Sequence, residues 1–144
     1  MPLPELEPGS PVHSASNYMF KHEVKDNKEL KELIGINPSQ TEWCAAFVNT
    51  MLHQNDIPGS ESVSDYPLMA RSFLTWGNKV KEPAVGDIVV FARGDDGWQG
   101  HVSFYIRTSN DGKYYYVLGG NQSDMVNVEA YPVRKVLSIR RWSR

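Results

Sequence analysis

Residues 41–54, TEWCAAFVNTMLHQ, carry the most regular pattern in the chain. Their apolar side chains recur at intervals of three and four residues, which predicts a helix with one buried face. Thr41 is a suitable N-cap, and Pro58-Gly59 follow the end of the helix. The chain's single cysteine then lies in the first turn and faces the core. The apolar face consists of Cys44, Phe47, Val48, Met51 and Leu52.

The segments around this helix are less regular. Residues 1–24 are rich in Pro, Ser and Glu and predict an extended arm. The remainder, 25–144, is expected to form a single domain. Residues 25–33 predict a short polar helix, and residues 66–76 predict a further helix capped by Asp65.

After Pro83 the pattern changes to short apolar runs separated by turn residues. Ser109-Asn110-Asp111-Gly112 is typical of a hairpin connection. Helices followed by an antiparallel sheet indicate an α+β fold. The expected strands are 87–92, 101–107, 114–118, 127–130 and 135–142.

Composition excludes several classes of protein. A net charge of −2 disfavours a nucleic-acid partner. One cysteine excludes an intramolecular disulfide and a cysteine-rich zinc site, and the four histidines lack metal-ligand spacing. We therefore expect no metal and no cofactor. No apolar run approaches the roughly 20 residues that span a bilayer, so no membrane contact is expected. The chain is expected to be a monomer.

Cys44 has two interpretations. A thiolate is the reactive form of cysteine, and a helix N-terminus favours it. A small buried core residue fits the same position equally well. His101, at the start of an expected strand after Gly100, could serve as the base that a nucleophilic thiol needs. It could equally be a surface histidine at a strand end.

A third group is expected to orient the imidazole of that histidine. Asn121, in the string LGGNQSD of residues 118–124, is our candidate, although Gly-Gly-Asn also suits a simple turn. The backbone N–H of Cys44 is a natural oxyanion donor. Further candidates for substrate or oxyanion contacts are Gln40, Trp43, Trp98 and Gln122.

Four segments in this order resemble the CHAP and NlpC/P60 superfamily of papain-like cell-wall hydrolases, and most closely its small phage and prophage members. They are residues 43–49 (WCAAFVN), 83–91 (PAVGDIVVF), 100–102 (GHV) and 118–122 (LGGNQ).

The resemblance implies a papain-like fold, with the cysteine in an N-terminal helical part and the histidine in a C-terminal antiparallel sheet. It assigns Cys44 as nucleophile, His101 as base and Asn121 as the orienting residue. Many CHAP domains carry a Glu two positions before that Asn, whereas this chain has Gly119.

The implied partner is peptidoglycan, cut either between muramic acid and L-Ala or within the stem peptide. The N-terminus lacks the features of a secretory signal. We therefore expect synthesis in the cytoplasm, followed by release or delivery to the cell wall, as for a phage endolysin. Two other functions fit the same residues: a non-catalytic virion or binding module, and a cysteine acyltransferase or deamidase toxin.

Overall fold

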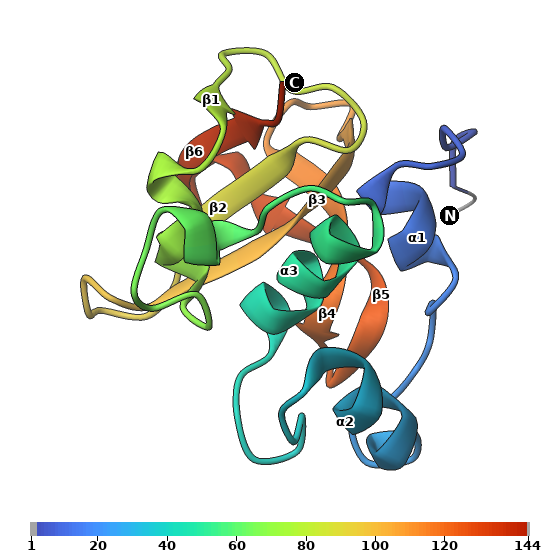
Figure 1. Ribbon diagram of the computed structural model, residues 1–144. Coiled ribbons are helices and arrows are strands. Elements are labelled where there is room, and N and C mark those ends of the chain that lie inside the picture. Colours follow the sequence, from blue (N-terminus) through green and yellow to red (C-terminus); the bar gives the residue numbers. More distant parts are fainter. Residues whose placement is uncertain (1–2, 144) are drawn as a thin grey trace.

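The structure is a computed structural model that describes residues 3–143 and combines helices with one antiparallel sheet (Figure 1). This agrees with the α+β class expected from the sequence. The helices are α1 (Pro11–Ser16), α2 (Asn27–Ile34) and α3 (Cys44–Gln54), with short 3-10 turns η1 (Ser60–Ser62), η2 (Ala70–Thr75) and η3 (Val133–Lys135). No helix in the described part of the chain is both long and apolar enough to span a bilayer.

The sheet has six strands in the order β1-β6-β2-β3-β4-β5, and all neighbours are antiparallel. Residues 20–23 extend its β5 edge, where His22 bridges to Met125. The strands are β1 (Asn78–Lys79), β2 (Ile88–Ala92), β3 (Gly100–Thr108), β4 (Tyr114–Gln122), β5 (Met125–Pro132) and β6 (Val136–Arg141).

Side chains alternate between the two faces of the sheet along each strand. Both faces of the central strands are buried. On one face, Val102 and Phe104 of β3 pack with Phe47 of α3 in the main core. The opposite face forms a second cluster of Val89, Phe91, Tyr105, Val117 and Ile139. Residues of β3 therefore point alternately toward α3 and away from it.

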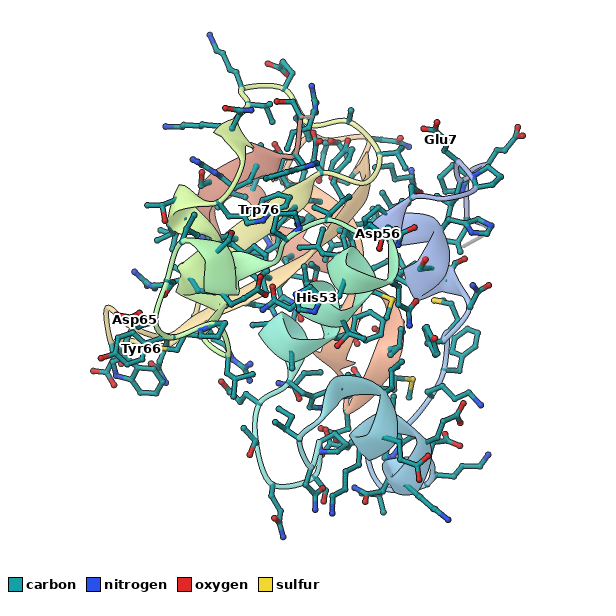
Figure 2. The ribbon with its side chains drawn as sticks, viewed as in Figure 1. Glu7, His53, Asp56, Asp65, Tyr66 and Trp76 are labelled. Atoms are coloured by element: carbon teal, nitrogen blue, oxygen red, sulfur yellow. The ribbon has the colours of Figure 1, made fainter. Side chains whose placement is uncertain are left out.

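Helix α3 lies against the sheet, with α1 and α2 beside it (Figure 1). It begins at Cys44, and its N-cap position is Trp43 rather than the predicted Thr41. Trp43 is fully buried, and its side chain makes no capping hydrogen bond to the helix. His53 lies on the side of α3 that faces away from the core, points outward and pairs with Glu61 (Figure 2).

The N-terminal segment departs from the predicted extended arm. Residues 11–16 form helix α1, which starts at a proline and is capped by the hydroxyl of Ser10, 3.3 Å from the His13 nitrogen. Val12 and Ala15 are buried in the core. Proline suits the first turn of a helix because its missing N–H is not needed there. Pro11, one of the prolines on which the prediction of an extended arm was based, is therefore the first residue of a short helix.

The helix predicted over residues 66–76 is also shorter than expected. Only η2 forms, and Met69 rather than Asp65 precedes it. The carbonyl of Pro67 accepts from Asn49 Nδ2 at 3.0 Å, which diverts it from helical bonding. Tyr66, at the start of the predicted helix, projects into solvent, whereas Trp76, at its end, lies inside the fold (Figure 2).

Candidate active site

Cys44 is the first residue of α3 and is 3% exposed. Burial raises the pKa of its thiol to about 11, even though the backbone N–H groups of Val102 and Ala45 act to lower it. The sulfur is therefore protonated at neutral pH. Its contact with Val102 also places it against the first residues of β3.

His101 lies in the second position of β3 and is 1% exposed. Its ring stacks on that of Tyr131, with centroids 4.6 Å apart and planes 16° from parallel. Burial lowers the pKa of the imidazole to about 4. The ring is therefore neutral at pH 7, and one of its two nitrogens carries the proton.

Gln122 determines which nitrogen that is. Its Nε2 donates to the carbonyl of Val117 and to both oxygens of Asn127, at distances from 2.9 to 3.2 Å. The amide orientation is thereby fixed, and Gln122 Oε1 must accept. This oxygen lies 2.9 Å from His101 Nε2 and 2.6 Å from Ser103 Oγ. Because Oε1 cannot donate, Nε2 is the protonated nitrogen.

His101 Nδ1 is then left with a free lone pair. It is buried and lacks a hydrogen-bond partner among residues 3–143. A buried acceptor without a partner is costly, so such an atom in a native fold needs an explanation. The residue after His101 contacts the Cys44 sulfur. The thiol of Cys44 therefore lies near the backbone of β3 at the residue that follows His101.

The side chain hydrogen-bonded to His101 is that of Gln122, whereas the sequence analysis expected Asn121 in this place. The structure records a register shift between Gly119 and Gln122 in the pairing of β4 with β5. Asn121 has φ 59°, the left-handed conformation of a bulge. Since side chains alternate along a strand, the extra residue turns Gln122 to the face of His101. Asn121 instead lines the cavities beside the site.

A chain of hydrogen bonds continues behind Gln122. Asn127 accepts from Gln122 Nε2 through Oδ1 at 3.0 Å and donates through Nδ2 to Glu129 Oε1 at 3.1 Å. Ser123 also donates to that carboxylate. The negative charge of Glu129 raises the pKa of His101, which opposes the larger effect of burial.

The resemblance to CHAP domains leads us to expect Glu at position 119, where this chain has Gly. A Cβ there would lie 2.9 Å from Gln122 Oε1 and still closer to Ser103 Oγ. Gln122 and Ser103 therefore fill the volume into which a side chain at position 119 would extend. The polar side chain that contacts His101 therefore comes from position 122 and not from position 119.

The other residues predicted to contact the substrate or the oxyanion do not lie together in one place. Trp43 is buried, donates to Glu23 at 3.0 Å, and does not face a cleft. Gln122 is also buried and faces His101 rather than a cavity. Gln40 is exposed and lines a cavity together with Asn121. Trp98 is 58% exposed on the loop between β2 and β3.

Ser103 and Tyr131 complete the surroundings of His101 but were missed in the sequence. Alternation along the strand could have identified Ser103, which lies two residues after His101 and therefore on the same face. No local signal marks Tyr131, which comes from another strand. Among residues 3–143, no three His, Cys, Asp or Glu side chains are grouped to hold a metal ion.

Comparison with known proteins identifies the family of the chain. No curated protein matches the chain. The family model described as the CHAP domain matches residues 36–121, more than half of the sequence. The matched region runs from the segment before α3 to Asn121 and includes both Cys44 and His101. The chain belongs to the CHAP domain family.

Proposed function

We propose that the protein is a peptidoglycan hydrolase in which Cys44 is the nucleophile, His101 the general base and Gln122 the residue that orients the imidazole. CHAP domains are generally cysteine- and histidine-dependent hydrolases of peptidoglycan. The observation that carries the proposal is the state of His101. Its Nε2 is fixed by Gln122, and its buried Nδ1 has no partner within the described chain.

The reaction would proceed through a thioester. His101 Nδ1 takes the thiol proton as the sulfur of Cys44 attacks the carbonyl carbon of an amide bond. The same nitrogen then gives this proton to the leaving amine as the C–N bond breaks. Water, deprotonated by His101, hydrolyses the thioester and restores the thiol.

The resting pair would be neutral. With the pKa of Cys44 at about 11 and that of His101 at about 4, a preformed thiolate and imidazolium is disfavoured. Proton transfer would therefore accompany the attack, with His101 acting as a general base. The bond from Nε2 to Gln122 becomes stronger as the ring acquires charge, because charge-assisted hydrogen bonds are the stronger ones.

The oxyanion that forms on the carbonyl would be stabilised at the start of α3. The first N–H groups of a helix have no partner within it, and that of Cys44 belongs to this set. The partial positive charge of the helix N-terminus acts in the same direction. Gln40, exposed at the neighbouring cavity, is the proposed polar contact for the substrate.

The test compares wild type with Cys44→Ala on purified sacculi and on a cross-linked Gram-positive wall. Soluble products are identified by mass spectrometry. Release of fragments by wild type alone is expected, and the fragment masses would distinguish an amidase from a stem-peptide endopeptidase. Lysis of cells by added protein would test a role as an endolysin or delivered lytic enzyme. If wild type releases no fragment from any wall, the proposed activity is wrong.

A further inference from the structure

A further cavity lies at the end of α3 that is opposite Cys44. Its volume is about 490 Å³, within the roughly 300–1,000 Å³ usual for small-molecule sites. It shares no lining residue with the two cavities that Asn121 lines. Helix α3 is about 16 Å long, so this distal cavity is separate from the thiol. Its lining includes Glu7, Leu52, Ile57, Arg140 and Trp142.

The aromatic part of the distal cavity is a stacked pair of indoles. Trp142 stacks on Trp76, with ring centroids 5.6 Å apart and planes 29° from parallel, and both rings line the cavity. Trp76 is buried, and its Nε1 donates to the carbonyl of Pro58 at 2.8 Å. Trp142 is half-buried, so part of its ring remains accessible. A ring already held in place loses little side-chain freedom when a ligand binds.

Two carboxylates without partners come from the N-terminal segment. Glu5 and Glu7 are exposed and line the distal cavity, and neither side chain has an ion pair or a hydrogen bond with another residue of the range 3–143. The backbone that carries them is anchored, because Leu6 packs against the main core and Ser10 Oγ donates to the carbonyl of Glu7 at 2.6 Å. The cavity therefore offers free hydrogen-bond acceptors.

Cations at the same cavity come from β6. Arg140 donates to the carbonyls of Trp76 and Gly77 at 2.7 and 3.2 Å, and it has no carboxylate partner in the described part of the chain. Arg141 and Asp87 neutralise each other through two hydrogen bonds of 2.7 and 2.8 Å. A ligand of either sign would meet a like charge here. The lining therefore favours a neutral ligand that both donates and accepts hydrogen bonds.

We propose that the distal cavity binds the N-acetylated glycan strand of peptidoglycan. The choice of this polymer rests on the proposed function. A sugar hydroxyl both donates and accepts hydrogen bonds, so carboxylates and guanidinium groups can both satisfy it. The C–H groups on one face of the sugar lie against the indole of Trp142, whose face carries partial negative charge. The acetyl methyl groups contact the apolar lining, to which Ile57 and Val85 contribute.

A glycan bound at the distal cavity does not reach the thiol, and it holds the protein on the wall. The wall carries many copies of the glycan and of the stem peptide attached to it. Binding of one raises the effective concentration of the other. Loss of the distal site should therefore raise the KM for insoluble wall and leave hydrolysis of a short soluble peptide unchanged.

The test is binding of the N-acetylglucosamine tetramer to Cys44→Ala by NMR titration, followed through the indole N–H signals of the four tryptophans. The Trp142 signal should shift. In the same background, Trp142→Ala should weaken binding roughly two- to tenfold through lost stacking. Because this ring packs on Trp76, the variant can also lose stability. E5A/E7A changes only exposed side chains and should weaken binding about tenfold.

Two matched controls remove similar groups elsewhere. Tyr66→Ala removes an exposed aromatic ring, and E32A/D65A removes two exposed carboxylates, none of which lines the distal cavity. Tyr66 and Glu7 lie on opposite sides of the molecule (Figure 2). Both controls should bind the tetramer as tightly as Cys44→Ala does.

The outcomes separate this inference from the proposed function. No binding of the tetramer, or binding that E5A/E7A and Trp142→Ala leave unchanged, would overturn the glycan site. Tighter binding of the deacetylated, cationic tetramer would also overturn it, because the cavity would then select an ammonium group. Site-specific binding without cleavage of any wall by wild type would support the distal site and refute the hydrolase. Cleavage of the wall without binding of the tetramer would do the reverse.

Discussion

Replacing Gln122 by methionine tests the assignment of the orienting residue. Methionine has a similar length but cannot accept from His101 Nε2 as Oε1 does at 2.9 Å. The variant also deprives the carbonyls of Val117 and Asn127 of a donor. We expect both a slower reaction and a less stable fold.

The kinetic effect follows from the geometry. A hydrogen bond to a charged group contributes about 1.5–3 kcal/mol, and the imidazole is charged during the reaction. This corresponds to a decrease of roughly 10- to 150-fold in kcat/KM. Ser103 Oγ lies 2.7 Å from the same Nε2 and remains as an acceptor. The decrease in kcat/KM should therefore be about tenfold for Gln122→Met alone, the lower limit of this range. It should approach the upper limit when Gln122→Met is combined with Ser103→Ala.

Hydrolysis of a stem peptide, normalised to folded protein by circular dichroism, measures this decrease. The buried carbonyls that lose a donor should reduce the free energy of unfolding by about 2–4 kcal/mol. The activity assays should therefore be run well below the melting temperature of the variant. Asn121→Gly is the matched control. It removes the neighbouring side chain, tolerates the positive φ of 59°, and leaves the bond to His101 intact.

Two results would refute this assignment. One is a full rate in Gln122→Met together with a large loss of kcat in Asn121→Gly. The other comes from ¹⁵N NMR of the His101 ring at neutral pH. The assignment requires a proton on Nε2 and none on Nδ1, and the opposite tautomer would contradict it.

Three further predictions concern burial. The folded-state pKa of His101 is about 4 against 6.5 in an unfolded chain, so below pH 6.5 the unfolded state binds the extra proton. The free energy of unfolding should fall by about 3 kcal/mol from this group as pH decreases to about 4, and denaturant titrations should show a smaller decrease in His101→Gln. Alkylation of Cys44 by iodoacetamide should accelerate with pH toward about 11; a rate plateau between about pH 5 and pH 8 would instead indicate a preformed thiolate. Gly120→Ala places a Cβ 2.5 Å from Trp43 Cζ3 and should cost about 1–3 kcal/mol by overpacking. Gly97→Ala, which meets no atom within 4 Å, should leave the melting temperature unchanged.

The sequence predicted those parts of the fold in which a periodic pattern coincides with burial. Helix α3 follows from the spacing of Phe47, Val48 and Met51, and its end at Gln54 was correctly placed. The strands on both sides of the Ser109–Gly112 turn were also found, because short apolar runs between turn residues are typical of strands. Both patterns are local, so a single sequence contains them.

Features that depend on tertiary contacts were missed. Helix α1 is stabilised by packing of Val12 and Ala15 in the core, which its proline-rich sequence does not indicate. The hydrogen bond from Asn49 to Pro67 O, which limits the helix predicted over residues 66–76, links residues 18 positions apart. Two-residue alternation would place Asn121 opposite His101, and only the bulge reveals that Gln122 lies there instead.

The bare Gly119 has a consequence for comparing this chain with other CHAP domains. An alignment made column by column would score the chain as lacking its third polar member, because the column that often holds Glu contains a residue without a side chain. In space, the amide of Gln122 occupies that place, three residues later along the same strand. A Glu grafted at 119 would therefore compete with Gln122 for one volume. Restoring the more common arrangement requires a paired exchange, with a small residue at 122, rather than a single substitution.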